Sequence, residues 1–361
     1  MSETWREIID QANELPAGLE RVALTEHAVR LADTGGSERD QYDARLELIE
    51  AANYAGCPER VLVAFSWCLA KYDASPNDYS PYKLMWRYKW VSEKLACFPQ
   101  VARAKIEEMH DDMEQRYRKL SYSVRPVFGG RFINALRMGL IDEAAKYFET
   151  YVGTKRDWMS DCAACECDVA VDYLIEKGQY AQAIDEATPI LKGKLYCAEV
   201  PQLTHANILR PLVLLGRMEQ AAEYHEKGYR KVSRDREFLG SIARHLQYLS
   251  CIQNDAKAIR LVEQHLPIAM RANDPLRRFQ FYASLYGFFA SLAERKPRAK
   301  KMMLPCDMPG FREDHRYRPI DLADQFLSDA KAMAEPFDDR NGNDYVSASI
   351  ERRRGFCDLG K

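Results

Sequence analysis

The sequence has almost no excess of charge of either sign. Its 52 lysine and arginine residues nearly balance 54 aspartate and glutamate residues, which leaves a formal net charge of −2. Proteins that bind nucleic acid through the phosphate backbone usually carry a strong positive excess on one face. We therefore do not expect nucleic acid to be a partner of this chain.

Long apolar runs are also missing. No stretch approaches the roughly 18 consecutive apolar residues that suggest a membrane-spanning helix, so we expect no membrane segment. Residues 1–9 have the pattern of an amphipathic helix and lack the apolar core of a signal peptide. We therefore expect a cytoplasmic protein, in which the ten cysteines are buried apolar side chains, metal ligands or reactive thiols more often than disulfides.

The motifs of common catalytic and nucleotide-binding sites are absent as well. The sequence has no Ser/His/Asp grouping, HExxH motif, P-loop or glycine-rich dinucleotide motif in a strand–turn–helix context. Acidic residues are abundant, but no pair suited to acid–base chemistry stands out from the charges of helix faces. We therefore expect that the chain is not an enzyme.

What the sequence does contain is a short phrase that recurs about every 38 to 42 residues. Each copy has a glycine or asparagine, a few polar positions and then an alanine-rich amphipathic stretch. A fixed period of this length indicates a solenoid of helical hairpins, in which each hairpin buries its apolar face by stacking on its neighbours. The four clearest copies, 39, 38 and 38 residues apart, begin at Gly139, Gly178, Gly216 and Asn254.

Helix-length apolar patterns lie on both sides of these anchors. Residues 169–175 form such a pattern before Gly178, and Ala183 and Ala187 recur at helical spacing after it. Glycine suits a helix exit because it adopts the left-handed conformation without steric cost. The small alanine side chains allow two helices to approach closely.

Weaker copies of the phrase extend the pattern toward the N-terminus. They begin at Gly18, Gly56 and Cys97, and with them residues 1–272 form about seven hairpins. The sequence therefore predicts an all-α fold, built as a superhelical solenoid of helix–turn–helix hairpins.

The C-terminal part departs from this period. We interpret residues 273–361 as an atypical terminal unit, continuous with the solenoid, because end repeats usually differ from internal ones. The pattern predicts a long helix with an aromatic stripe, an inserted loop and two further helices. In order, these are Pro275 to Glu294, residues 295–319, Asp321 to about Glu335, and Tyr345 to Arg354.

The anchor phrase resembles the tetratricopeptide repeat. Tyr180 stands two residues after Gly178, and Ala183 and Ala187 supply small residues at contact positions of the next helix. The period is longer than is usual for that family, which implies longer helices or turns. Several stretches resemble uncharacterised bacterial proteins of this type, namely residues 46–52, 64–69, 86–90, 161–166 and 197–201.

The resemblance implies binding in place of catalysis. Solenoids present extended surfaces, so we expect a non-enzymatic scaffold or adaptor that binds a protein or peptide. The alternative is a peptide-sensing regulator that acts by sequestering another protein. Only about fifteen residues precede the first repeat-like helix, which is too few for a helix-turn-helix domain.

A cluster of cysteines is the best candidate for metal binding. Cys162 and Cys165 form a C-x-x-C pair, which is the usual half of a tetrahedral zinc site. Cys197 follows at nearly one repeat, so stacked hairpins would bring it close to the pair. We expect a structural zinc ion here, and the alternative is a set of buried thiols. The candidates for the fourth ligand are His205, His225 and Cys167.

Trp86, Arg87, Tyr88 and Trp90 form a second candidate site. The two tryptophans are spaced i, i+4 and therefore lie on one helix face. Aromatic side chains flanked by cations suit a groove that binds a peptide or protein partner. The alternative is that these large side chains fill gaps between stacked hairpins.

Four histidines stand at equal intervals of twenty residues, at His205, His225, His245 and His265. Twenty is not the repeat period, so the four cannot all occupy equivalent positions. We interpret their spacing as a coincidence.

Overall fold

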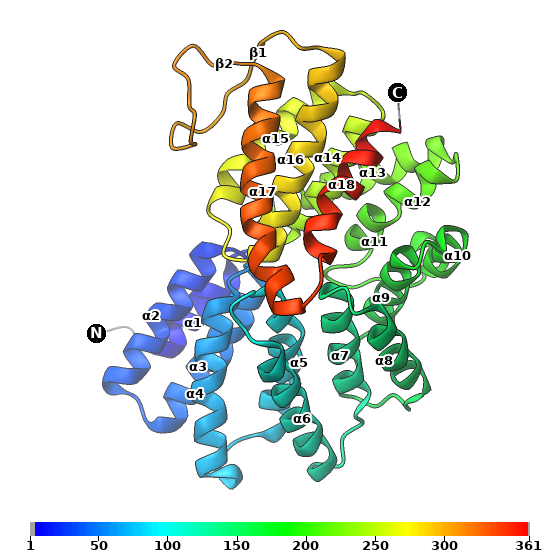
Figure 1. Ribbon diagram of the computed structural model, residues 1–361. Coiled ribbons are helices and arrows are strands. Elements are labelled where there is room, and N and C mark those ends of the chain that lie inside the picture. Colours follow the sequence, from blue (N-terminus) through cyan, green and yellow to red (C-terminus); the bar gives the residue numbers. More distant parts are fainter. Residues whose placement is uncertain (1–3, 360–361) are drawn as a thin grey trace. The chain divides into compact units, whose positions relative to one another are not determined.

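A computed structural model describes residues 4–359, and nearly all of their regular structure is α-helix (Figure 1). The all-α class predicted from the sequence is therefore confirmed. The helices pack as two compact units, unit 1 (Met1–Ser160) and unit 2 (Asp161–Lys361).

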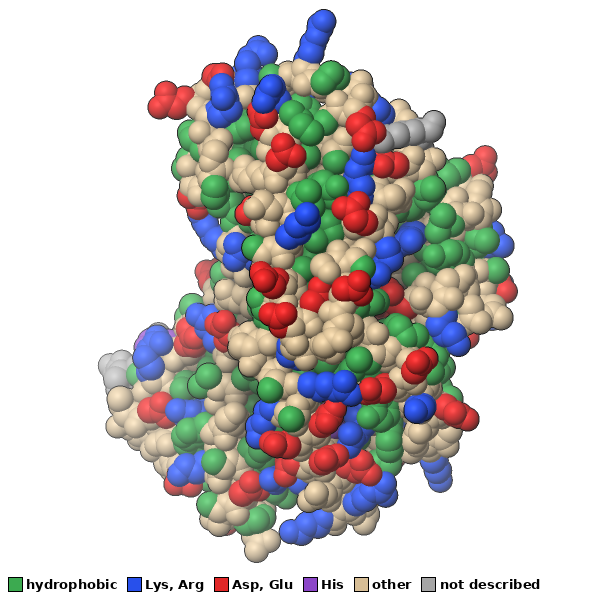
Figure 2. Space-filling model, in the orientation of Figure 1, with side chains coloured by type: hydrophobic (Ala, Val, Ile, Leu, Met, Phe, Trp, Pro, Cys, Tyr) green, Lys and Arg blue, Asp and Glu red, His purple; other side chains and the backbone are tan. Residues whose placement is uncertain are grey.

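Charged side chains of both signs are interspersed over the visible face of the molecule (Figure 2). Among the described residues, no helix combines the length and the apolar character that crossing a bilayer requires.

Unit 1 contains the helices α1 to α8 and two short 3-10 helices. They are α1 (Trp5–Glu14), α2 (Leu19–Gly35), α3 (Glu38–Tyr54), α4 (Pro58–Ala74), η1 (Pro76–Asp78), α5 (Pro81–Lys94), η2 (Leu95–Cys97), α6 (Arg103–Lys119), α7 (Arg125–Arg137) and α8 (Ile141–Gly153). Consecutive helices pack together, and α1 also contacts α3, α3 contacts α5, and α5 contacts α7.

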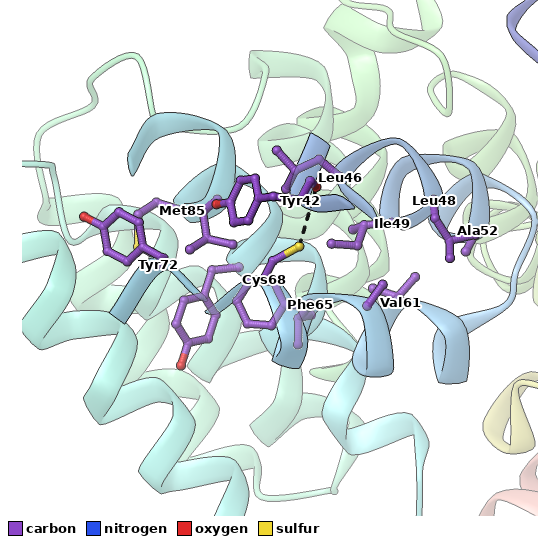
Figure 3. Close-up of a cluster of buried hydrophobic side chains, with 14 of the residues drawn as sticks. Tyr42, Leu46, Leu48, Ile49, Ala52, Val61, Phe65, Cys68, Tyr72 and Met85 are labelled. Atoms are coloured by element: carbon purple, nitrogen blue, oxygen red, sulfur yellow. Dashed lines mark hydrogen bonds between the residues drawn. The ribbon is translucent and has the colours of Figure 1, made fainter. Parts of the chain in front are cut away.

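The core of unit 1 forms where α3 and α4 face each other (Figure 3). Ile49 of α3 and Phe65 of α4 are almost completely buried there. Cys68 belongs to the same cluster, and its thiol donates to the carbonyl oxygen of Tyr42 at 3.9 Å. Burying a side chain such as Phe65 contributes about 1.5–3 kcal/mol, so this apolar face fixes how the two helices pair.

Unit 2 contains the helices α9 to α18. They are α9 (Ala163–Glu176), α10 (Tyr180–Leu191), α11 (Gln202–Asn207), α12 (Leu209–Leu214), α13 (Met218–Val232), η3 (Arg236–Phe238), α14 (Leu239–Cys251), α15 (Asp255–Met270), α16 (Pro275–Arg295), α17 (Pro319–Asn341) and α18 (Tyr345–Asp358). In this unit α9 contacts α11, α11 contacts α13, and α14, α17 and α18 all contact α16.

Recurring cap geometry explains why the helices end at the predicted anchors. Gly139, Gly178 and Gly216 each follow a helix with φ of 74°, 72° and 72°. At each of them the next residue donates its N–H to the carbonyl five positions back, as when Gln179 donates to Leu174 at 2.8 Å. This is the Schellman cap, which satisfies carbonyls that the helix leaves open. The predicted turns at these glycines are confirmed.

Helix starts are equally well encoded. Thr4 and Glu7 form a capping box at α1, and Ser37 and Asp40 form another at α3. In each box two side chains satisfy backbone N–H groups that the first helical turn leaves without partners.

The C-terminal part agrees with the sequence at α16 and differs at α17. The predicted helix from Asp321 ends near Glu335, whereas α17 continues to Asn341 and ends at Gly342 with φ of 70°. Pro336 lies inside the helix. The inserted loop contains a two-residue antiparallel ribbon of β1 (Lys300–Lys301) and β2 (Arg316–Tyr317), in which Lys300 pairs with Tyr317.

Gly228 lets the α13 backbone approach its neighbours closely. A Cβ atom at this position would stand 2.8 Å from the His205 Cβ and 3.2 Å from the His245 ring. We expect Gly228→Ala to lower the free energy of unfolding by about 1–3 kcal/mol because the site is overpacked. The matched control is Gly355→Ala on α18, where a Cβ meets nothing within 4 Å, and it should raise that free energy by up to about 1 kcal/mol. Urea denaturation of the two variants measures both, and equal changes would contradict this account of the packing.

Candidate functional site

Three cysteine sulfurs converge in unit 2. The Sγ atoms of Cys162, Cys165 and Cys197 all lie within 4.8 Å of one another. The Cys165 and Cys197 sulfurs are 3.5 Å apart. The proximity of Cys197 to the C-x-x-C pair, expected from the repeat spacing, is confirmed, and this group could hold a metal ion.

Local backbone structure positions each of these sulfurs. Cys162 is the N-cap of α9, and its Sγ accepts the N–H of Cys165 at 3.4 Å. Cys197 lies in the connection between α10 and α11, where its own N–H donates to the Val200 carbonyl at 2.9 Å. The site is therefore made from a helix N-terminus and a tight turn.

The surroundings disfavour three thiolates without a cation. Burial raises the pKa of Cys165, and the neighbouring thiols of Cys197 and Cys162 raise it further. Burial also raises the pKa of Cys197, while the N–H of Glu199 is the largest of the influences that lower it. A bound cation reverses this balance, because a coordinating thiol loses its proton outright.

The structure separates the other candidate ligands from these three cysteines. The Cys167 thiol donates to the Glu186 carbonyl at 3.2 Å. His205 is buried on α11 with its ring centroid 5.2 Å from that of Tyr224. His225 lies beside His245. Within residues 4–359, the Cys162, Cys165 and Cys197 group contains no fourth metal-ligating side chain.

The structure places Arg87 and Tyr88 in the interior of unit 1. Arg87 donates to the Leu46 carbonyl at 2.9 Å and forms an ion pair with Glu50 at 2.9 Å. The Tyr88 hydroxyl donates to Asp112 at 2.7 Å. These two side chains therefore join α5 to α3 and α6.

Trp86 and Trp90 are half-buried against the core of unit 1. The Trp90 ring centroid lies 5.9 Å from that of Tyr54. Trp86 lies 5.9 Å from the ring of Tyr82, and the Tyr82 ring lies 4.8 Å from that of Trp158. Trp86 therefore belongs to a chain of aromatic contacts that reaches the surface, whereas Trp90 contacts Tyr54.

We call Tyr82, Trp86, Tyr122 and Trp158 the aromatic surface. Tyr122 joins it through an edge contact with Trp158 at 4.8 Å. Trp158 is 58% exposed and Tyr82 is 40% exposed, while Trp86 and Tyr122 are half-buried. Sequence reasoning missed Trp158, which stands alone in the connection after α8, although a tryptophan in a polar turn was a usable signal.

Trp158 is exposed but firmly held. The Asp157 carboxylate accepts the N–H groups of Ser123 at 2.7 Å and of Met159 at 2.9 Å. The fully buried Lys89 donates to the Met159 carbonyl at 2.8 Å, and its Nζ lies 3.4 Å from the ring centre of Trp86. One buried cation therefore contacts both the Trp86 ring and the residue that follows Trp158.

No model of a known protein family matches the chain, and no curated protein matches its sequence.

Lys89 should control the position of Trp158. We expect Lys89→Met to lower the free energy of unfolding by about 1–3 kcal/mol, because the buried Met159 carbonyl loses its donor. Trp158 should then become more accessible to iodide, which is measured by fluorescence quenching. The exposed Lys83 of the same helix provides the control variant Lys83→Met. Identical stability and quenching in the two variants would show that Lys89 does not hold this segment.

Proposed function

We propose that this chain is a non-enzymatic scaffold or adaptor, a helical-repeat protein similar in architecture to tetratricopeptide solenoids, which binds a protein or peptide partner. Two observations support the architecture. Alternate helices contact each other in both units. In unit 1, α1 contacts α3, α3 contacts α5 and α5 contacts α7, and in unit 2, α9 contacts α11 and α11 contacts α13. The same cap recurs at Gly139, Gly178 and Gly216, as a repeated hairpin requires.

The observation that carries the binding function is the exposure of Trp158. Trp158 is 58% exposed and therefore leaves apolar surface in contact with water. A partner that covered this surface would gain about 25 cal/mol of binding free energy for each Å² removed from water. Its segment is already ordered by Asp157 and Lys89, so binding requires little further loss of conformational entropy. Ordered, partly exposed tryptophan and tyrosine are typical of binding hot spots.

The charges near this surface suggest the kind of peptide that binds. Lys83 adjoins Tyr82, and Lys155 and Arg156 precede Trp158; all three cations are exposed. We infer that the partner segment combines an apolar anchor, which packs on the aromatic rings, with acidic side chains, which face these cations.

Removing Trp158 should weaken this binding. In a display selection with a random peptide library against the full chain, we expect enriched peptides to bind Trp158→Ala about 30-fold more weakly, the effect of losing about 2 kcal/mol at a hot spot. Fluorescence anisotropy of a labelled selected peptide measures the dissociation constants. Val63 on α4 is 74% exposed, and Val63→Ala is the matched control. Equal affinities for both variants would refute the assignment of this surface.

We further propose that Cys162, Cys165 and Cys197 hold a structural zinc ion. Thiolate sulfur is the ligand type that zinc uses in structural sites. The ion would join the start of α9 to the turn before α11, and so connect two successive hairpins of unit 2.

The zinc ion should be lost when Cys197 is replaced. We expect about one zinc ion per chain in the native protein, measured by native mass spectrometry and metal analysis, and loss of that ion together with a lower Tm in Cys197→Ser. Cys306→Ser is the control, since Cys306 is exposed in another loop. A His205→Gln variant should keep the zinc ion, because the structure separates His205 from the three cysteines. Zinc content that is unchanged in Cys197→Ser would exclude this site.

A further inference from the structure

Three of the equally spaced histidines form a buried cluster in unit 2. His225 lies on α13, His245 on α14 and His265 on α15, and all three are buried. We call them the histidine cluster. A step of twenty residues is close to half a repeat, so the three histidines lie on three consecutive helices.

Hydrogen bonds connect the cluster through α13. The Nδ1 atoms of His225 and His245 are 3.0 Å apart. The hydroxyl of Tyr229, also on α13, lies 3.1 Å from Nε2 of His265. In the histidine pair one ring must donate and the other accept. If both rings were protonated, two N–H groups would oppose each other at this distance.

Two further ring nitrogens of the cluster are buried and have no hydrogen-bonding partner among the described residues. These are Nε2 of His245 and Nδ1 of His265. We assign the neutral tautomers that leave both atoms without a proton: His245 donates through Nδ1, and the Nε2–H of His265 donates to the Tyr229 oxygen. Adding a proton to either atom creates a buried N–H donor without an acceptor, which is costly in a protein interior.

The groups that face the cluster oppose a positive charge. Burial is the main cause that lowers the pKa of His225 and of His265 to about 4, and it lowers the pKa of His245 further below its usual range. The other influences on these pKa values are cationic or imidazole groups. They are Lys257 for His225, and His225, His205, Arg244 and His265 for His245.

We propose that the histidine cluster makes the packing of α13 against α14 and α15 responsive to acid. Taking up protons at these rings breaks the His225–His245 pair and separates the three helices. Unit 2 thus contains a conformational device that is closed while its imidazoles are neutral and opens in mild acid.

The direction of the effect follows from where the protons bind. Above pH 6.5 the imidazoles are neutral in the folded and unfolded states, so the cluster adds no pH dependence. As the pH falls from 6.5 toward 4, the unfolded chain takes up protons that the folded cluster refuses. Stability is lost over that interval. Between pH 7 and pH 5 each imidazole shifts the equilibrium about 20-fold toward the open state.

One buried carboxyl group acts in the opposite sense. Asp168 of α9 is raised in pKa to about 7, chiefly by burial and then by Asp172. Its folded form therefore takes up a proton between pH 7 and 5 that the unfolded chain refuses, which favours the folded state about 50-fold. The buried His205 on α11 adds a fourth imidazole, whose pKa burial also lowers to about 4. Four imidazoles against this one carboxyl group leave a net loss on the order of a thousandfold.

Hydrogen exchange of the full chain tests the proposal. Exchange rates of peptides from α13, α14 and α15 are measured from pH 7 to 5 and corrected for the intrinsic effect of pH. We expect protection in native protein to fall on the order of a thousandfold. In His225→Asn/His265→Gln, which retains polar atoms in similar places without a titrating ring, protection should fall about 400-fold less than in native protein. His315→Gln in the α16–α17 loop is the control and should behave as native protein.

A second measurement covers the case in which the double variant does not fold. NMR titration of the histidine ring carbons in native protein should show the cluster imidazoles remaining neutral to below pH 5. An imidazole of the cluster that titrates near 6.5 would overturn the proposal. So would a double variant that folds and loses protection as the native protein does. The single variant His265→Gln should reduce the loss of protection about 20-fold.

Discussion

Each helix of this protein is apolar on a face that it cannot bury alone, and the rest of the structure depends on that constraint. The α3 and α4 pair shows it directly, because Ile49 and Phe65 are buried only when the two helices face each other. The chain must then reverse quickly, and the left-handed glycines at Gly139, Gly178 and Gly216 achieve this while closing the preceding helix. A repeated reversal brings alternate helices side by side within each unit.

The same constraint explains where the candidate sites lie. Much of each helix face is used in packing, and several side chains of the candidate sites stand at the ends of helices and in the turns. Cys162 is an N-cap, Cys197 lies in a turn, and Trp158 lies in the connection after α8. Backbone hydrogen bonds in the surrounding segment order each of these residues. The side chains are therefore held in place although they lie outside the packed helix faces.

The sequence predicts the hairpins well because their signals are local. A glycine after an apolar helical pattern indicates the end of a helix whichever helix packs against it. The three cysteines could likewise be placed together from their spacing of nearly one repeat. Which face of a helix is buried depends on partners distant in sequence. The sequence therefore suggests that Tyr88 and Arg87 are surface residues beside two tryptophans. In the structure both are buried, and they donate hydrogen bonds to Asp112 of α6 and to the Leu46 carbonyl of α3.

At the end of α17 the local sequence signals predict the wrong helix boundary. Pro336 and the acidic turn residues after it suggest a helix that ends at Glu335, but the helix continues to Asn341. Proline removes a single N–H donor from the helix. The apolar face of α17 continues past it, since Phe337 is buried. Burial of one phenylalanine contributes about 1.5–3 kcal/mol, which offsets much of the cost of about 3 kcal/mol for an internal proline.

The two units differ in the polar groups that they bury. Unit 1 directs cationic side chains at backbone carbonyls: Arg87 at Leu46, Lys89 at Met159, and Arg125 at Tyr151. Unit 2 buries the histidine cluster and the Asp168 carboxyl group, whose pKa burial raises to about 7. Unit 1 also buries one imidazole, that of His110, whose pKa burial lowers to about 3. Acid therefore acts on both units, and more of the buried imidazoles belong to unit 2. The contacts that hold the aromatic surface run through Lys89 and Asp157.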